Sequence, residues 1–237
     1  MSLFQLNNLT KVYRNEEVET QALRGVSFSI EKGEFVSIMG PSGSGKSTLL
    51  QIMGFLDDPT DGEYLFNGIS WRTYSRDDLA HVRNKNMGFV FQSFNLLART
   101  DVLHNVMLPL WYSDVPASQW RSKAEKAIES VDLSHRLHHV PSQLSGGEKQ
   151  RCAIARALVL DPDVIFADEP TGNLDSKNGE RVMEILTDLH EKQGHTVIVI
   201  THETDTAKHA QRIITIKDGL IASDSKVKRR AKRPLRK

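Results

Sequence analysis

The chain has 237 residues, with 31 basic and 30 acidic side chains, a hydrophobic share of 39% and one cysteine. The length suggests one large domain or two small ones, and the composition excludes a wholly disordered chain. The lone Cys152 excludes an internal disulfide framework and fits a reducing compartment. No apolar run approaches the ~18 residues that cross a bilayer, and no secretory signal is visible. We therefore expect any membrane role to come through a partner or through surface attachment.

Charge is distributed unevenly along the chain. Residues 225–237 hold eight basic side chains and no acidic one, and residues 1–224 carry a net charge of −7. A run of like charges repels itself, so we expect an unstructured basic tail at 225–237 after a folded body at 1–224. Three roles stay open for this tail: a solvated segment, an arm for nucleic acid, and a contact with anionic lipid.

Short apolar segments in the first part of the chain have the length and spacing of strands. They are residues 4–13, 23–30, 34–39, 63–66 and 87–91, with a helix expected at about 46–54 and a shorter one near 77–83. Residues 101–140 differ, because apolar side chains recur there at helical spacing and no strong strand is visible. We interpret about 101–147 as an inserted helical subdomain.

Apolar strands alternate with helices again after this insertion. Strands are expected at 164–167, 196–201 and 212–216, and helices from 148, over 178–191 and near 205. Buried strands that alternate with helices imply an α/β fold, with a mostly parallel sheet covered on both faces.

A glycine-rich segment follows the strand at 34–39 and carries the clearest chemical signal. It reads Gly40, Pro41, Ser42, Gly43, Ser44, Gly45, Lys46, Ser47 and Thr48, which matches the pattern G-x-x-x-x-G-K-[S/T]. Glycines let the backbone N–H groups converge on phosphate oxygens, and the following helix adds the positive end of its dipole. Lys46 would place its charge on the phosphates, and the Ser47 hydroxyl would reach Mg²⁺. The alternative is a flexible Gly/Ser linker.

Two acids follow the apolar strand at 164–167. Ligands of open α/β sheets bind at the carboxyl ends of strands, which is where Asp168 and Glu169 lie. Asp168 is placed to hold Mg²⁺, and Glu169 to accept a proton from water. Taken without the glycine-rich loop, this pair would read as a strand-end turn with solvated acids.

A second possible anion site precedes the helix at 148. Ser145, Gly146 and Gly147 offer a hydroxyl and backbone N–H groups at a helix start. One nucleotide seldom needs two phosphate cradles in one chain, so we expect each cradle to serve a different nucleotide in a dimer. The alternative is an ordinary helix N-cap.

The order of these motifs resembles that of ATP-binding cassette (ABC) ATPases. The resemblance covers about residues 3 to 222 and rests on the loop at 40–48, Gln92, the segment 144–148, Asp168-Glu169, the segment 173–175 and His202. Segments 54–57, 88–92 and 170–176 are further similar to the lipoprotein-release and macrolide-export branch. The resemblance implies a P-loop core with a mostly parallel sheet, an N-terminal antiparallel β subdomain and the inserted helical subdomain.

The resemblance also implies ATP and Mg²⁺ as cofactors and assigns roles by position. Tyr13 would stack on adenine, Gln92 would contact Mg²⁺ or the attacking water, and Glu169 would be the general base. His202 would contact the γ-phosphate. Asp175 would lie at the dimer interface, and Ser145 and Gly147 would reach the nucleotide of the other subunit.

The expected partners are a second copy of the chain and a separate membrane permease, at the cytoplasmic face of the cell membrane. Export, lipoprotein release and transmembrane force transmission are all open. Two alternatives remain: a cell-division ABC ATPase without transported substrate, and a soluble ABC ATPase acting on nucleic acid. No second cassette or coiled-coil insertion favours nucleic acid, so we do not expect it as a partner.

Overall fold

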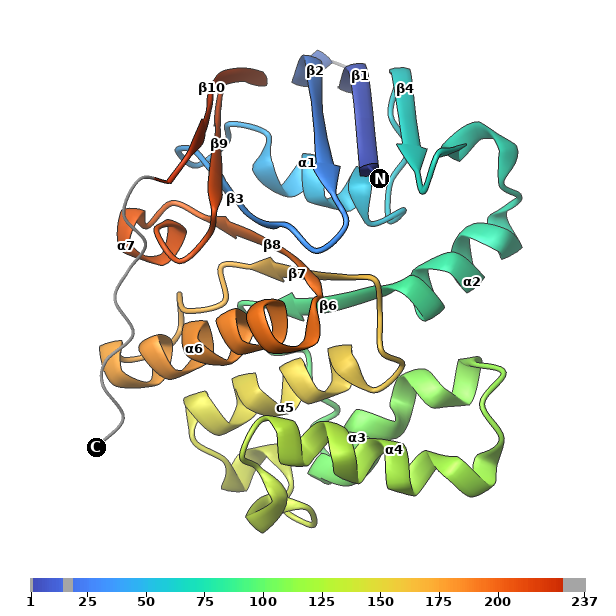
Figure 1. The fold of residues 1–237 in the computed structure, drawn as a ribbon, viewed down its shortest axis with the longest axis vertical. Coiled ribbons are helices and arrows are strands. Elements are labelled where there is room, and N and C mark those ends of the chain that lie inside the picture. Colours follow the sequence, from blue (N-terminus) through green and yellow to red (C-terminus); the bar gives the residue numbers. More distant parts are fainter. Residues whose placement is uncertain (1, 15–18, 228–237) are drawn as a thin grey trace. The chain divides into compact units, whose positions relative to one another are not determined.

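The computed structural model describes residues 2–14 and 19–227, and these divide into two compact units (Figure 1). Unit 1 comprises residues 1–80 and 196–237, and unit 2 comprises residues 81–195. The first segment of unit 1 ends at residue 80, which lies within helix α2 (Arg76–Asn86).

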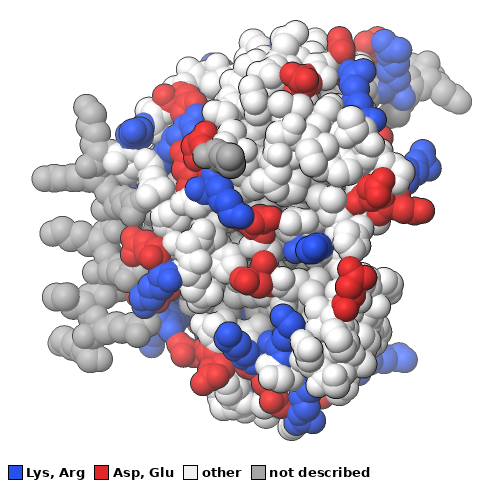
Figure 2. Space-filling view, turned by 45° about the vertical axis from the view of Figure 1, so that its right-hand side comes forward, with Lys and Arg blue, Asp and Glu red and all other residues white. Residues whose placement is uncertain are grey.

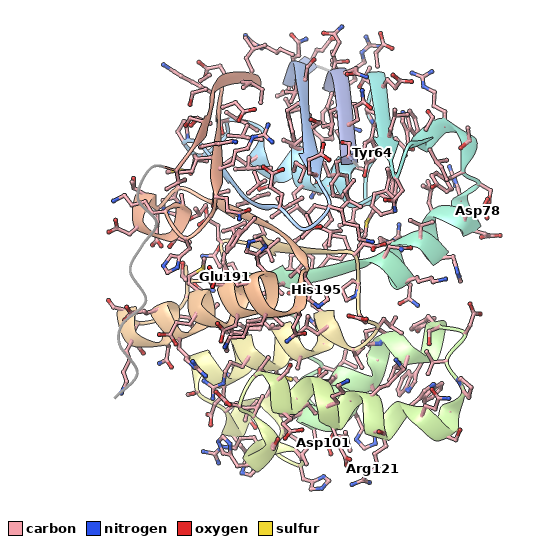
Figure 3. The ribbon with its side chains drawn as sticks, in the orientation of Figure 1. Tyr64, Asp78, Asp101, Arg121, Glu191 and His195 are labelled. Carbon is pink, nitrogen blue, oxygen red and sulfur yellow. The ribbon has the colours of Figure 1, made fainter. Side chains whose placement is uncertain are left out.

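Unit 1 begins with an antiparallel sheet in the order β2-β1-β4-β5. Its strands are β1 (Ser2–Arg14), β2 (Glu19–Glu31), β4 (Asp61–Phe66) and β5 (Ile69–Ser70). Apolar side chains on one face, such as Phe4 and Leu6, are fully buried. Tyr64 of β4 is also buried, and its hydroxyl donates to the carbonyl oxygen of Met53 at 2.5 Å (Figure 3). The expected N-terminal antiparallel subdomain is therefore confirmed.

A second sheet of unit 1 contains parallel strands. Strand β3 (Phe35–Met39) pairs in parallel with β8 (Thr196–Thr201) and with β9 (Arg212–Lys217), and β10 (Leu220–Lys226) pairs antiparallel with β9. Strand β8 is buried along its whole length, as its continuous apolar run predicts. The helices are α1 (Lys46–Met53) and α7 (Thr204–Ala207), and a 3-10 turn spans Trp71–Thr73.

Unit 2 combines one parallel strand pair with most of the helices. Strand β6 (Met87–Phe91) pairs with β7 (Val164–Asp168). The helices are α3 (Val102–Met107), α4 (Ala117–Ser130), α5 (Gly146–Leu158) and α6 (Ser176–Gln193), with 3-10 turns at Leu108–Tyr112, Ser134–Arg136 and Pro141–Gln143. Helices α3 and α4 lie within the region 101–147 that was expected to be helical, and they lie together with α5 in Figure 1. Their shared core includes Leu103, Ile128 and Ala155, all buried.

Two strands of unit 1 were not predicted. Neither β5 nor the edge strand β10 has a buried apolar residue, so both lack the hydrophobic pattern that identifies the other strands in the sequence. Strand β10 includes Ser225 and Lys226, the first two residues of the expected tail. The remainder of the tail from residue 228 lies outside the described residues, and its contact with lipid stays a prediction.

The surface carries mixed charge on the face in Figure 2, where acidic and basic side chains are interspersed. Within residues 2–14 and 19–227, no helix combines the length and the apolar character needed to cross a bilayer.

Candidate functional site

The glycine-rich loop connects β3 to α1 in unit 1, as the sequence predicts. Gly45 is the N-cap of α1 with φ 102°, and neither a side-chain cap nor an acidic residue balances the first turn of this helix. Lys46 is only 8% exposed. Its ammonium donates to the carbonyl oxygens of Gly40 and Pro41, each at 2.8 Å. The N-terminus of α1 is thus a positive end without a counter-charge, which suits a bound anion.

Close backbone packing explains the glycines of this loop. A Cβ on Gly45 would lie 2.5 Å from the carbonyl oxygen of Ala22, and one on Gly40 would overlap the carbonyl oxygen of Ile216. Gly43, at φ 76°, faces open space, so its glycine is required by the backbone angle. The buried hydroxyl of Ser44 has no hydrogen-bond partner within the described chain. An open loop with a lysine and spare donors fits a polyphosphate and its metal ion.

Strand pairing brings His202 to the same edge as this loop. Met39, the last residue of β3, pairs with Thr201, the last residue of β8. Because the two strands are parallel, Gly40 and His202 leave the sheet side by side at its carboxyl edge. Unit 1 therefore groups His202 with the loop 40–48, as the resemblance implies.

The same arrangement occurs in unit 2 for two other predicted residues. Phe91, the last residue of β6, pairs with Asp168, the last residue of β7. Gln92 and Glu169 therefore leave neighbouring parallel strands at one edge. Glu169 has φ 46°, in the left-handed region that a non-glycine residue seldom adopts. Such backbone strain is concentrated at functional positions of proteins.

Contacts within unit 2 hold the segment that follows Glu169. A Cβ on Gly172 would lie 2.6 Å from the side-chain amide nitrogen of Gln92, so the end of the Gln92 side chain would have to shift if Gly172 carried a side chain. The Asn173 amide donates to the carbonyl oxygen of Gln92 at 2.9 Å. Gln150 of α5 is fully buried, and its amide donates to the carbonyl oxygen of Pro170 at 2.9 Å. Gln150 was not predicted as a site residue, because a glutamine within a helix does not by itself indicate a function.

The second predicted cradle starts α5 in unit 2. Ser145 is the N-cap and accepts a hydrogen bond from the backbone N–H of Glu148 at 3.3 Å, while the Glu148 carboxylate accepts one from the backbone N–H of Ser145 at 2.8 Å. Burial tends to raise the pKa of Glu148, but the Ser145 bonds and the Arg136 guanidinium lower it to about 2. This is a capping box, as the N-cap alternative predicts, and the anion-binding role of this helix start stays a prediction.

Asp175 lies beside this cradle. It is the N-cap of α6, and its carboxylate accepts hydrogen bonds from the backbone and the side-chain amide of Asn178, at 2.9 and 2.6 Å. These bonds lower the pKa of Asp175. A Cβ on Gly147 would overlap the Asn178 side chain, so the starts of α5 and α6 are in direct contact. Unit 2 thus brings together Ser145, Gly147 and Asp175.

Tyr13 lies in β1 and is 37% exposed. Its hydroxyl donates to Asp57 at 2.8 Å, and it also shares a hydrogen bond with Thr48 in the first turn of α1. The predicted adenine-stacking residue is therefore attached to the phosphate loop's own helix. Lys11 and Asp57 contact Tyr13, but neither was predicted from the sequence to belong to the nucleotide site.

Comparisons with known proteins identify the relatives of this chain. The family model described as "ABC transporter" matches residues 23–172. The macrolide export ATP-binding/permease protein MacB of Chlorobaculum tepidum is 53% identical over 224 residues, which cover 94% of this chain and 34% of that protein. The chain thus spans about a third of the length of the MacB relatives that it matches.

Other relatives match along nearly their whole length. An uncharacterized ABC transporter ATP-binding protein of Thermotoga maritima is 51% identical, and the match covers 92% of this chain and 93% of that protein. The dimeric structure of the ATP-binding cassette MJ0796 in a post-hydrolysis state bound to ADP and Pi has a TM-score of 0.86 at 44% identity. It covers 95% of this chain and 99% of the cassette.

Proposed function

This chain belongs to the ABC transporter family, and we propose that it powers a membrane permease. It is an ATP-binding and ATP-hydrolysing cassette that uses ATP and Mg²⁺. The observation that carries the hydrolytic role is the pairing of two sets of strand ends, Met39 with Thr201 and Phe91 with Asp168. Gly40 and His202 follow the first pair, and Gln92 and Glu169 follow the second. Each pair stands at the carboxyl edge of parallel strands, where ligands of such sheets bind.

The residues of unit 1 hold the nucleotide in this proposal. The backbone N–H groups of the loop 40–48 bind the phosphates, and Lys46 neutralises their charge. Ser47 supplies a hydroxyl for the metal ion, and Tyr13 stacks on the base. His202 would donate a hydrogen bond to the terminal phosphate and so stabilise the charge on its oxygens in the transition state.

The residues of unit 2 supply the water chemistry. Asp168 and Gln92 hold the metal ion, directly or through water, and Glu169 accepts a proton from the attacking water. The Gln92 side chain lies close to Gly172, and the carbonyl oxygen of Gln92 accepts a hydrogen bond from the Asn173 amide.

Two copies of the chain form the working unit. In this proposal, the nucleotide held by the loop 40–48 of one copy contacts four residues of the other copy: Ser145, Gly146, Gly147 and Asp175. The relation to the MJ0796 cassette, whose structure is dimeric, supports this arrangement. The relation to MacB supports a permease for export or release as the driven partner, at the cytoplasmic face of the membrane.

Replacement of the proposed base tests this function. In Glu169→Gln the amide cannot take a proton from water, so ATPase turnover falls by roughly 10²- to 10⁴-fold while MgATP binding remains. Turnover is measured by phosphate release, and binding by calorimetry.

Glu129→Gln is the matched control, because Glu129 is an exposed residue of α4 in the same unit. Its turnover should equal that of the unmodified protein. Wild-type turnover in Glu169→Gln would contradict the assignment of the base. Failure of the unmodified protein to bind MgATP would contradict the function itself.

The permease partnership has its own test. A membrane protein encoded beside this chain, with a large external domain, should co-purify with it from detergent and raise its ATPase activity. Co-purification of the chain with ribosomes or DNA, in place of such a protein, would favour the nucleic-acid alternative.

A further inference from the structure

We propose that Lys11 and Asp57 are positioning residues that clamp Tyr13, and so set how tightly the protein recognises the base of its nucleotide. The inference rests on the proposed function, since it assumes that Tyr13 stacks on adenine. It concerns only unit 1, which contains all three residues and the loop 40–48.

The two carboxylate oxygens of Asp57 are divided between the other two residues. One oxygen accepts the hydroxyl hydrogen of Tyr13 at 2.8 Å, and the other accepts the Lys11 ammonium at 2.6 Å. The same ammonium lies 4.9 Å from the centre of the Tyr13 ring and donates to the carbonyl oxygen of Asp58 at 2.6 Å. The phenol is thus fixed at its hydroxyl end by Asp57, and its ring by the Lys11 cation.

Partial burial makes this arrangement stronger than a surface ion pair. The side chains of Lys11 and Asp57 are 12% and 28% exposed. Water therefore competes little for the Lys11 ammonium, and few alternative positions are open to it. Tyr13 as a whole residue is 37% exposed, so part of it remains accessible to a flat ligand while the hydroxyl is held.

Protonation states fix the direction of each bond. Burial opposes ionisation of Asp57, but hydrogen bonds from Lys11 and Tyr13 outweigh it and hold the pKa of Asp57 below its usual value. Burial raises the pKa of Tyr13; a hydrogen bond from Thr48 lowers it, and Asp57 raises it again. At neutral pH the phenol therefore keeps its proton and donates it to an ionised carboxylate.

Local structure delivers Asp57 to this place. Helix α1 ends at Met53, and the chain turns back through Phe55 at φ 54°. The backbone N–H groups of Leu56 and Asp57 both donate to the carbonyl oxygen of Gln51, at 2.8 and 3.2 Å. The clamp is therefore built on the helix whose first turn completes the phosphate loop. Phosphate and base recognition share one rigid element.

A held ring binds a base more tightly than a free one, because its rotational freedom is lost before the ligand arrives. Base–aromatic stacking contributes roughly 5- to 150-fold in affinity. Loss of the clamp should remove part of this stacking contribution and lower ATP affinity by roughly 3- to 30-fold. Inorganic tripolyphosphate, which has no base, should not be affected.

The test compares these two ligands by calorimetry. Asp57→Asn and Tyr13→Phe should each weaken ATP binding while tripolyphosphate binding stays constant. Tyr13→Phe keeps the ring and removes only the hydroxyl, so it tests the clamp even if Asp57→Asn unfolds. A general loss of structure would weaken both ligands together, and therefore would not change their ratio. The loss should appear in KM for ATP more than in kcat.

Asp61→Asn is the matched control, since Asp61 forms an exposed ion pair with Arg72 at 3.6 Å in the same unit. Its ratio of ATP to tripolyphosphate affinity should equal the wild-type ratio. Tyr13→Ala separates the two hypotheses. If Tyr13→Ala weakens only ATP but Asp57→Asn and Tyr13→Phe keep the wild-type ratio, the clamp is wrong and the stacking role stands. If Tyr13→Ala also keeps the wild-type ratio, the stacking role is wrong and the clamp is overturned with it.

Discussion

The two helix starts that face phosphate in this account, those of α1 and α5, are built in opposite ways. Helix α1 has no side-chain cap and no acid in its first turn, and its first residue is Lys46. Helix α5 is capped by Ser145, and Glu148 already balances its first turn. Lys46 is buried against its own loop, whereas Ser145 is exposed. The N-terminus of α1 thus needs a bound anion to balance its positive end, whereas that of α5 is balanced without a bound anion.

This difference suggests a division of labour. The loop 40–48 should bind a nucleotide in a single copy of the chain. The start of α5 should add affinity only when a partner presents a nucleotide to it. Each of the following predictions tests one side of that comparison.

The largest effect is expected at Lys46. Lys46→Ala removes the charge from the loop, so ATP affinity should fall by at least roughly 10-fold and turnover by roughly 10²- to 10³-fold. Lys149→Ala is the matched control, since Lys149 lies in the first turn of α5. Equilibrium dialysis with single copies of the chain should show normal ATP binding for the control. An equal loss for both variants would remove the distinction between the two helix starts.

Alanine in place of the glycines distinguishes the two starts by stability. In Gly43→Ala the left-handed backbone costs about 1–2 kcal/mol of unfolding free energy. Gly45→Ala should cost more, because its Cβ would also meet the carbonyl oxygen of Ala22 at 2.5 Å. Gly146→Ala should change the free energy by less than about 0.5 kcal/mol, since Gly146 lacks a positive φ. Its Cβ would meet the flexible end of Leu174 at 3.3 Å and the carbonyl oxygen of Asn173 at an ordinary contact distance of 3.7 Å. Urea unfolding gives all three values, and the reverse order would be inconsistent with the described backbone.

A smaller, pH-dependent effect is expected at Glu148. Its pKa is lowered from an ordinary value of 4.5 to about 2, so its charge stabilises the fold fully above pH 4.5. That contribution declines as pH falls from 4.5 towards 2. Glu148→Gln should lower the free energy of unfolding by about 1 kcal/mol at pH 7, and the difference from wild type should shrink in acid. A constant difference from pH 7 to pH 3 would argue against an ionised Glu148 in the cap.

The parts of the fold with strong hydrophobic patterns could be predicted from the sequence. Strand β8 and the loop before α1 are examples, because burial and phosphate chemistry restrict their residues. Strands β5 and β10 were missed, although each follows a two-residue turn, Asn67-Gly68 or Asp218-Gly219, with both φ values positive. Asn-Gly and Asp-Gly are strong hairpin signals, so turn chemistry would have found what hydrophobic pattern did not.

The site shows the same limit. Local sequence patterns were enough to select Lys46, Asp168 and Glu169. They were not enough to select the residues that hold other site residues in place. Asp57 meets Tyr13 across 44 positions of the sequence, and Gln150 meets Pro170 across 20. Such contacts depend on tertiary packing, which no local pattern records.

Dimer formation in a hydrolysis-deficient background tests the central claim most directly, namely that α5 serves the nucleotide of a second copy. Light scattering with saturating MgATP should show Glu169→Gln as a dimer. Glu169→Gln with Ser145→Arg should stay monomeric and still bind ATP as tightly as a single copy, because its loop 40–48 is intact. A double variant that dimerises as fully as Glu169→Gln, or a monomer that has lost ATP binding, would contradict the account.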